Sequence, residues 1–210
     1  MANGATADGV GDACDPRPTR PGDSIAFFAA CDQADSELVR FNATSFSDDG
    51  MVVGSVDGAG SAQLRFRPNL TRADMRFTVL ASAATGTQWV GLWYRTATSD
   101  RRASFASINR AIPAAAVADL DEAQLTGPNR LSDSTIAAPA LLPGMEFQLS
   151  VDTARLSTND DVLHLNAMNP PVNASIALSS TVADISGDPF FEANLVQVRL
   201  HYLILYASQN

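Results

Sequence analysis

The chain has 210 residues, of which 46% are hydrophobic, and this is enough to close one sizeable core in a single all-β domain. All 14 basic residues are arginine, and they are outnumbered by 19 aspartates and 4 glutamates, so the net charge is −9. That charge argues against a nucleic-acid partner, because binding to a phosphate backbone needs clustered positive charge. No window approaches the roughly 18 apolar residues of a membrane-spanning helix, and the opening MANGATADG lacks the basic and apolar regions of a secretory signal.

Residues 1–23 are rich in Gly, Pro, Ala and Asp and contain almost nothing apolar to bury. This composition predicts an extended linker. We therefore expect one folded domain, over residues 24–210.

A short motif within the linker, DGVGDACD at residues 8–15, has the chemistry of a calcium loop. Oxygen ligands converge on Ca²⁺ from tight turns that glycine permits, which makes Asp8, Asp12 and Asp15 candidate ligands. The string resembles the end of a thrombospondin type 3 calcium repeat. That resemblance implies a secreted or cell-surface setting, and we expect the chain to be the C-terminal domain of a larger exported bacterial protein.

Two cysteines, Cys14 and Cys31, lie seventeen positions apart near one end of the chain. In an oxidising compartment a disulfide between them would close a loop worth about 3 kcal/mol in the chain-entropy account. Two unrelated thiols are the alternative that the sequence leaves open.

From residue 24 onward the dominant signal is the period-two alternation of half-buried β-strands. In MEFQLSVD at residues 145–152, for example, every second residue is apolar. The predicted strands cover residues 25–29, 37–42, 51–56, 62–68, 74–82, 88–95, 145–152, 162–167, 175–182 and 194–207. About ten strands separated by Asp, Gly, Asn and Pro turns predict an all-β fold, an antiparallel two-sheet β-sandwich or jelly roll.

One segment departs from this pattern. PAAAVADLDEAQL at residues 113–125 is rich in alanine, and Pro113 suits the first turn of a helix. We expect one short surface helix there, inside a long excursion between strands that covers residues 96–142.

The last strand alternates regularly and then changes character. Residues 203–205 are apolar on both faces, as in a central strand that is covered on both sides. Before them, Val196, Val198, Leu200 and Tyr202 are expected on one face, and Gln197, Arg199 and His201 on the other.

Four stretches carry a second resemblance: RFRPNLTRADMRFTVLAS (65–82), the hairpin TGTQWVGLWYRT (85–96), GMEFQLSVDTARL (144–156) and the final VQVRLHYLILYA (196–207). Their order is similar to that of concanavalin-like and laminin-G-like sandwich domains. This resemblance implies two packed antiparallel sheets. A viral single jelly roll would give much the same strands, so a structural protein of a virion or other assembly is the alternative.

The stretch QWVGLWYR at residues 88–95 is the candidate binding strand. Alternation places Trp89, Gly91, Trp93 and Arg95 on one face. Flat aromatic rings beside polar groups suit sugars, whose C–H faces stack while their hydroxyls form hydrogen bonds. We expect neighbouring strands to add polar side chains to the same face: Arg65, Arg76, Gln148, Asp152 and Arg199. The alternative is that both tryptophans fill the core.

Signatures of catalysis are sparse. The sequence contains only two histidines, His164 and His201, which we expect to be ordinary strand residues, and it contains neither G-x-S-x-G nor H-E-x-x-H. Concanavalin-like glycoside hydrolases imply the string E-x-D-x-x-E for their paired carboxylates, and this string does not occur.

Two acidic pairs, Asp48–Asp49 and Asp160–Asp161, fall in predicted turns. We interpret them as solvated turn residues, with Ca²⁺ binding at the sandwich rim as the alternative. Together these features predict a non-catalytic extracellular binding or adhesion module with a glycan or another cell-surface partner. A glycoside hydrolase-related enzyme is a further alternative.

Overall fold

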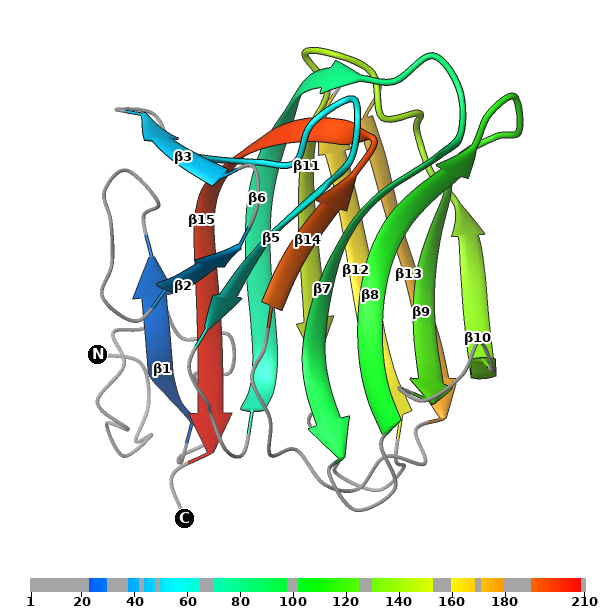
Figure 1. The fold of residues 1–210 in the computed structure, drawn as a ribbon. Helices are drawn as coiled ribbons and strands as arrows, with labels where there is room; N and C mark the ends of the chain where they lie inside the picture. The colour runs from blue at the N-terminus through cyan, green and yellow to red at the C-terminus, as the bar shows by residue number, and fades with distance from the viewer. Residues whose placement is uncertain are drawn as a thin grey trace.

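The computed structural model describes residues 23–29, 38–41, 44–47, 50–64, 70–97, 102–124, 130–152, 160–168, 171–179 and 190–208. These residues form two antiparallel sheets that pack face to face as a β-sandwich (Figure 1). The predicted fold class is confirmed.

Sheet A has eight strands. Their bounds are β1 (Asp23–Ala29), β3 (Thr44–Ser47), β4 (Gly50–Val53), β6 (Leu70–Ser82), β11 (Glu146–Asp152), β12 (Asp160–Met168), β13 (Pro171–Ser179) and β15 (Val196–Ser208). Seven of them lie in the order β13-β12-β11-β6-β15-β4-β3, and β1 pairs with the second half of β15. The long strands β6 and β15 therefore form the centre of sheet A.

Sheet B has seven strands. Their bounds are β2 (Leu38–Phe41), β5 (Ala59–Leu64), β7 (Thr87–Ala97), β8 (Arg102–Ala111), β9 (Val117–Gln124), β10 (Arg130–Ala137) and β14 (Phe190–Asn194). They lie in the order β10-β9-β8-β7-β14-β5-β2.

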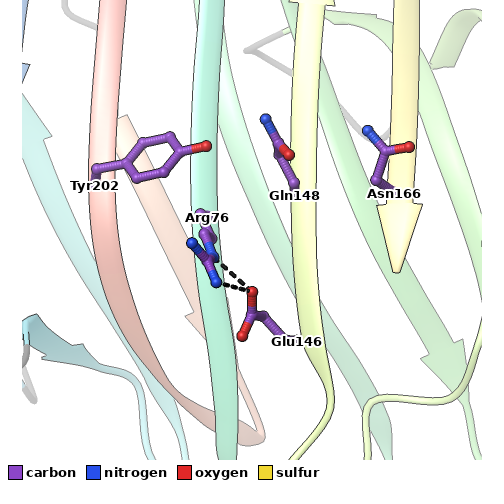
Figure 2. Close-up of a pocket in the computed structure, with 5 residues that line it drawn as sticks. All are labelled: Arg76, Glu146, Gln148, Asn166 and Tyr202. Atoms are coloured by element: carbon purple, nitrogen blue, oxygen red, sulfur yellow. Dashed lines mark hydrogen bonds and ion pairs between the residues drawn. The ribbon is translucent and has the colours of Figure 1, made fainter. Parts of the chain in front are cut away.

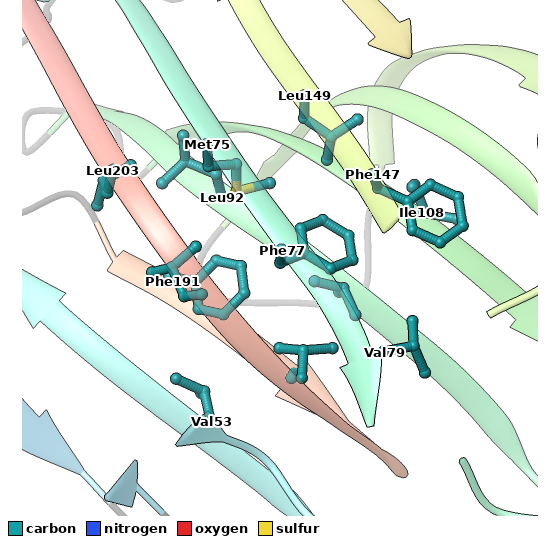
Figure 3. Packing of buried hydrophobic residues seen from close by; sticks show 14 of the residues in the cluster. Val53, Met75, Phe77, Val79, Leu92, Ile108, Phe147, Leu149, Phe191 and Leu203 are labelled. Carbon is teal, nitrogen blue, oxygen red and sulfur yellow. The ribbon is translucent and has the colours of Figure 1, made fainter. Parts of the chain in front are cut away.

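The core lies between the sheets and is formed by every second side chain of the strands, which points inward. In β6, Met75, Phe77 and Val79 are fully buried, and Phe147 of β11 stacks on Phe77 with 5.4 Å between the ring centroids (Figure 3). Phe191 of β14 reaches the same ring from sheet B, with 6.3 Å between centroids. Burial of each phenylalanine stabilises the fold by about 1.5–3 kcal/mol, so this aromatic group is a main contact between the layers.

The predicted helix at residues 113–125 is wrong. A turn covers Ile112 and Pro113, and residues 117–124 are strand β9, which pairs with β8 and β10. The expected excursion over residues 96–142 is therefore three strands of sheet B. Ala118 is fully buried opposite Ile108 of β8, and pairing with two neighbouring strands overrides the helical propensity of the alanines.

Two of the crossings between the sheets approach each other closely at one end of the sandwich. Gly54 lies between β4 of sheet A and β5 of sheet B, and Leu195 lies between β14 of sheet B and β15 of sheet A. Both have positive φ, 81° and 52°. A Cβ at Gly54 would lie 2.3 Å from the carbonyl oxygen of Val196, so the close approach of the two crossings requires glycine.

A β-bulge interrupts β15 at His201. Leu200 pairs with Phe77 and Tyr202 pairs with Arg76, so one extra residue lies between two consecutive positions of β6. Leu200 and Leu203 are both buried in the core, and the two residues between them face away from it. The expected placement of Tyr202 on the inner face is therefore wrong.

Candidate functional site

Four polar side chains form a row across the outer face of sheet A. Tyr202 on β15 lies opposite Arg76 on β6, Arg76 opposite Gln148 on β11, and Gln148 opposite Asn166 on β12. Neighbouring strands lie about 4.8 Å apart, so the row extends over about 14 Å. Glu146, one outward position along β11 from Gln148, completes the group.

These five residues line a hollow of about 180 Å³ (Figure 2). The hollow lies on the outer face because the residues that alternate with its lining are buried: Met75 and Phe77 in β6, and Phe147 and Leu149 in β11. The core thus fixes the backbone beneath the site, and the polar side chains project from a rigid sheet.

An ion pair closes one side of the hollow. The Nε atom of Arg76 donates a hydrogen bond of 2.5 Å to Oε1 of Glu146, and Nη2 approaches the same oxygen. The Arg76 side chain is 45% exposed, so the pair lies at the surface and not in the core. Because both nitrogens use Oε1, the other carboxylate oxygen of Glu146 points away from the pair (Figure 2).

Tyr202 extends its ring from β15 toward β6 (Figure 2). Burial, helped by the negative charges of Asp74 and Glu146, raises the pKa of the Tyr202 phenol above its ordinary value of 10.0, although Arg76 and Arg72 oppose the rise. The hydroxyl is therefore protonated at neutral pH and can donate a hydrogen bond.

A buried charge cluster lies beside the hollow on the same face. Asp74 is 5% exposed, and it accepts hydrogen bonds from Nε of Arg72, at 3.0 Å, and from Oγ of Ser150. The Arg72 guanidinium also lies over the ring of Tyr206, 5.8 Å from its centroid. These contacts hold β6, β11 and β15 together just beyond Tyr202.

The predicted binding face is divided between the two sheets, so the prediction of a single face is wrong. Trp89 lies on β7 of sheet B, whereas Arg76, Gln148, Asp152 and Arg199 lie on strands of sheet A. The cause is the connection at residues 83–86, which leads from β6 to β7 but crosses from one sheet to the other. Strands adjacent in sequence are here on opposite layers.

Trp89 is half-buried on the outer face of sheet B, since its neighbours Val90 and Leu92 are the residues that fill the core. The alternative that Trp89 is a core residue is therefore wrong. Trp93 and Arg95 occupy β7, with a register shift between them, and the structure describes their backbone alone.

The other predicted positions are placed as follows. In β11, the backbone of Asp152 lies opposite Arg72, and in β15 Arg199 is half-buried opposite Thr78. His201, at the bulge, shares a 2.8 Å hydrogen bond between its Nε2 and Oγ1 of Thr78. The pair Asp160–Asp161 opens β12, so its placement in a turn is wrong. His164 is a residue of the same strand.

Several predictions lie outside the described residues: the linker with Asp8, Asp12 and Asp15, the pair Cys14 and Cys31, the pair Asp48–Asp49, and Arg65. Within the residues that are described, no group of three or more His, Cys, Asp or Glu side chains is arranged to hold a metal ion. No helix in that part of the chain is long and apolar enough to cross a membrane.

No family model matches the sequence, and no curated protein sequence matches it either. Similarity appears in the fold. The CBM2 module of the evolved Dit protein of Lactobacillus casei BL23 phage J-1 has a TM-score of 0.68 at 6% identity, covering 90% of this chain and 97% of its own.

Two further solved structures show the same likeness. The lectin UEA-II complexed with galactose has a TM-score of 0.61 at 10% identity, covering 88% of this chain and 100% of its own. The β-glucanase of Bacillus licheniformis has a TM-score of 0.58 at 6% identity, covering 85% and 96%. Identities this low establish the fold alone: an antiparallel two-sheet β-sandwich of the jelly-roll kind, which these structures share.

Proposed function

We propose that this domain binds a neutral glycan in the hollow on sheet A and performs no chemistry on it. The observation that carries the proposal is the row of Tyr202, Arg76, Gln148 and Asn166, with Glu146 beside it, on one rigid outer face.

The hydrogen-bonding groups of the hollow match those of a sugar. A sugar hydroxyl both donates and accepts, and each of the two amides, Gln148 and Asn166, offers one oxygen acceptor and one NH₂ donor. The Arg76–Glu146 pair offers the same combination, with guanidinium donors beside a free-pointing carboxylate oxygen. The Tyr202 ring provides an apolar surface for the C–H face of a pyranose, and its hydroxyl donates.

Charge favours a neutral ligand. Arg76 and Glu146 neutralise each other within the hollow, and the whole chain carries a net charge of −9. An anionic glycan would meet no uncompensated cation among the five lining residues and would be repelled by the overall field.

The carboxylates argue for binding without hydrolysis. Glu146 is the one acid among the five lining residues. Asp74 shares its face, but its backbone position is four residues, about 13 Å along the strands, from that of Thr78, the partner of Glu146. Arg72 and Ser150 hold the Asp74 carboxylate, and Arg76 holds that of Glu146. Glycoside hydrolases need two carboxyl groups about 5–10 Å apart.

The comparisons support this proposal at the level of fold. One similar structure is described as a carbohydrate-binding module, CBM66 of Bacillus subtilis, with a TM-score of 0.54 at 10% identity over 78% of this chain and 91% of its own, and another is a lectin complexed with galactose. Glucanases share the fold too, so fold alone does not separate binding from hydrolysis.

The test is calorimetric titration of the full chain with cellohexaose, laminarihexaose, xylohexaose and galactobiose, beside the anionic polymers polygalacturonate and heparin. We expect binding of a neutral probe, and a three- to tenfold loss of affinity in Gln148→Ala, Asn166→Ala and Tyr202→Ala, as for one lost hydrogen bond or stacking contact. Ser45→Ala, an exposed position on edge strand β3 of the same sheet, is the matched control.

Binding confined to an anionic polymer, or wild-type affinity in all three hollow variants, would overturn the proposal. Size-exclusion chromatography of the same samples addresses the rival function, because a shell or assembly protein forms large symmetric oligomers. Release of shorter products from any probe would establish hydrolysis instead.

We also propose that the chain acts outside the cell and that its opening motif binds Ca²⁺ through Asp8, Asp12 and Asp15. The support is the resemblance of DGVGDACD to a calcium repeat. If Ca²⁺ binds the native chain, CaCl₂ raises its thermal midpoint relative to EDTA, and Asp12→Asn reduces the rise. Equal midpoints with CaCl₂ and EDTA would remove this part of the proposal.

A further inference from the structure

Trp89 lies between two asparagines on the outer face of sheet B. In the strand register Trp89 of β7 pairs with Asn194 of β14 on one side and with Asn109 of β8 on the other. All three side chains are half-buried, so they belong to the surface of the sheet and not to the core. A flat aromatic ring is thus bordered by one amide on each neighbouring strand.

Both amides are held in a fixed orientation. The Nδ2 atom of Asn194 donates a 2.9 Å hydrogen bond to the carbonyl oxygen of Thr87, and Nδ2 of Asn109 donates to Oδ2 of Asp119. Each nitrogen uses one N–H in this bond, so each amide keeps its oxygen acceptor and one N–H donor for a ligand beside the ring.

Asp119, which accepts the hydrogen bond from Asn109, is a buried carboxylate. Asp119 faces away from the core, next to the buried Ala118 in β9, yet it is only 1% exposed. Burying a carboxylate costs free energy unless it is hydrogen-bonded, and Asn109 supplies one of those bonds. A buried acid that fixes a surface amide is the arrangement expected of a pre-organised binding group.

Two small residues lie beside the ring along the sheet. Gly91, the next outward position along β7 from Trp89, has no side chain, and it pairs with Ser107 of β8. Both positions are buried, so the surface that a ligand can contact is confined to the ring and the two amides.

We propose that this Trp89 surface, made of Trp89, Asn109 and Asn194, is a second sugar-binding site, separate from the hollow on sheet A. The ring stacks on the C–H face of a pyranose, and the two amide oxygens accept hydrogen bonds from its hydroxyls. The two sites lie on opposite outer faces of the sandwich, whose sheets are about 10 Å apart, so one sugar unit cannot occupy both. The domain is therefore bivalent and joins two glycan chains.

The experiment is calorimetric titration of the full chain with cellohexaose, laminarihexaose, xylohexaose and galactobiose, together with tryptophan fluorescence. Wild-type protein is expected to bind two molecules of the recognised probe, and Trp89→Ala and Asn194→Ala are expected to weaken one of the two sites at least fivefold. Tyr202→Ala is expected to weaken the other site three- to tenfold. Probe binding should also shift the tryptophan emission in Tyr202→Ala and leave it unchanged in Trp89→Phe. Thr135→Ala, an exposed position on β10 of sheet B, is the control.

The outcomes separate this proposal from the function proposed for the hollow. One bound molecule, held more weakly in Tyr202→Ala and unaffected by Trp89→Ala and Asn194→Ala, overturns the second site and leaves the hollow. One bound molecule lost only in the sheet B variants overturns bivalency and the hollow together. Far-ultraviolet circular dichroism verifies that each variant is folded. If Trp89→Ala does not fold, the result for Asn194→Ala tests the second site. Absence of binding to every probe overturns both proposals.

Discussion

Arg76 directs two nitrogens, Nε and Nη2, at a single oxygen of Glu146 across the β6–β11 ladder. Since the pair lies at the surface, Glu146→Gln is expected to change the free energy of unfolding by less than about 1 kcal/mol. Affinity for a neutral sugar should fall several-fold, because a carboxylate acceptor binds a hydroxyl more strongly than an amide oxygen does. Urea denaturation and calorimetric titration measure the two effects separately. A large loss of stability with unchanged affinity would mean that the pair is structural.

Removal of Asp74 is expected to lower the stability of the fold, in contrast to the substitution of Glu146. Asp74 is buried and hydrogen-bonded by Ser150 from the neighbouring strand, so Asp74→Ala leaves a buried hydroxyl and the Arg72 guanidinium without this acceptor. We expect a loss of about 1–3 kcal/mol in the free energy of unfolding. In a double-mutant cycle with Ser150→Ala, a coupling of at least about 0.5 kcal/mol is expected. Additive effects in urea denaturation would contradict the contact.

Gly54 and Gly144 provide a matched test of the crossing between the sheets. Both have positive φ, 81° and 85°, but a Cβ at Gly54 would meet the Val196 carbonyl oxygen at 2.3 Å, whereas nothing lies within 4 Å of one at Gly144. Gly144→Ala measures the backbone cost alone, about 1 kcal/mol. Gly54→Ala should cost several times more, because β15 must shift. Equal thermal midpoints for the two variants would refute the close approach.

Glu192 gives a pH-dependent expectation. Burial raises the pKa of its carboxyl above the ordinary value of 4.5. Between the unfolded and the folded pKa the native state binds more protons than the unfolded state, so the free energy of unfolding falls as pH rises through this window. Glu192→Gln should remove that fall and be more stable than the wild type at pH 7. Parallel stability–pH curves for the two proteins, from urea denaturation between pH 4 and 8, would contradict it.

The alternation of apolar residues was enough to predict the sandwich and the inner face of residues 145–152, where Phe147 and Leu149 are buried. It failed at β9, where alanine-rich sequence is compatible with either a helix or a strand and the choice depends on pairing with β8 and β10. Such pairing is a non-local property that no local window contains.

Two members of the hollow, Arg76 and Gln148, were predicted, and Glu146, Asn166 and Tyr202 were missed. Tyr202 was assigned to the wrong face because strict alternation does not allow for a bulge. A signal was present, since the apolar spacing changes from two residues, at Leu200, to three, at Leu203. The alternation within a strand does not show which sheet the strand joins. For this reason Trp89 and Arg76 were predicted on one surface.

The pairing of the first and last strands determines how the domain responds to force. Asp23, where β1 begins, is paired with Ser208, where β15 ends, and the two strands are antiparallel. Tension applied at these two residues therefore separates β1 from β15 one hydrogen-bonded pair at a time. It does not load all the pairs together in shear. Under load, the sandwich therefore begins to open at the β1–β15 pair, before the strands that carry the two proposed sites are pulled apart from one another.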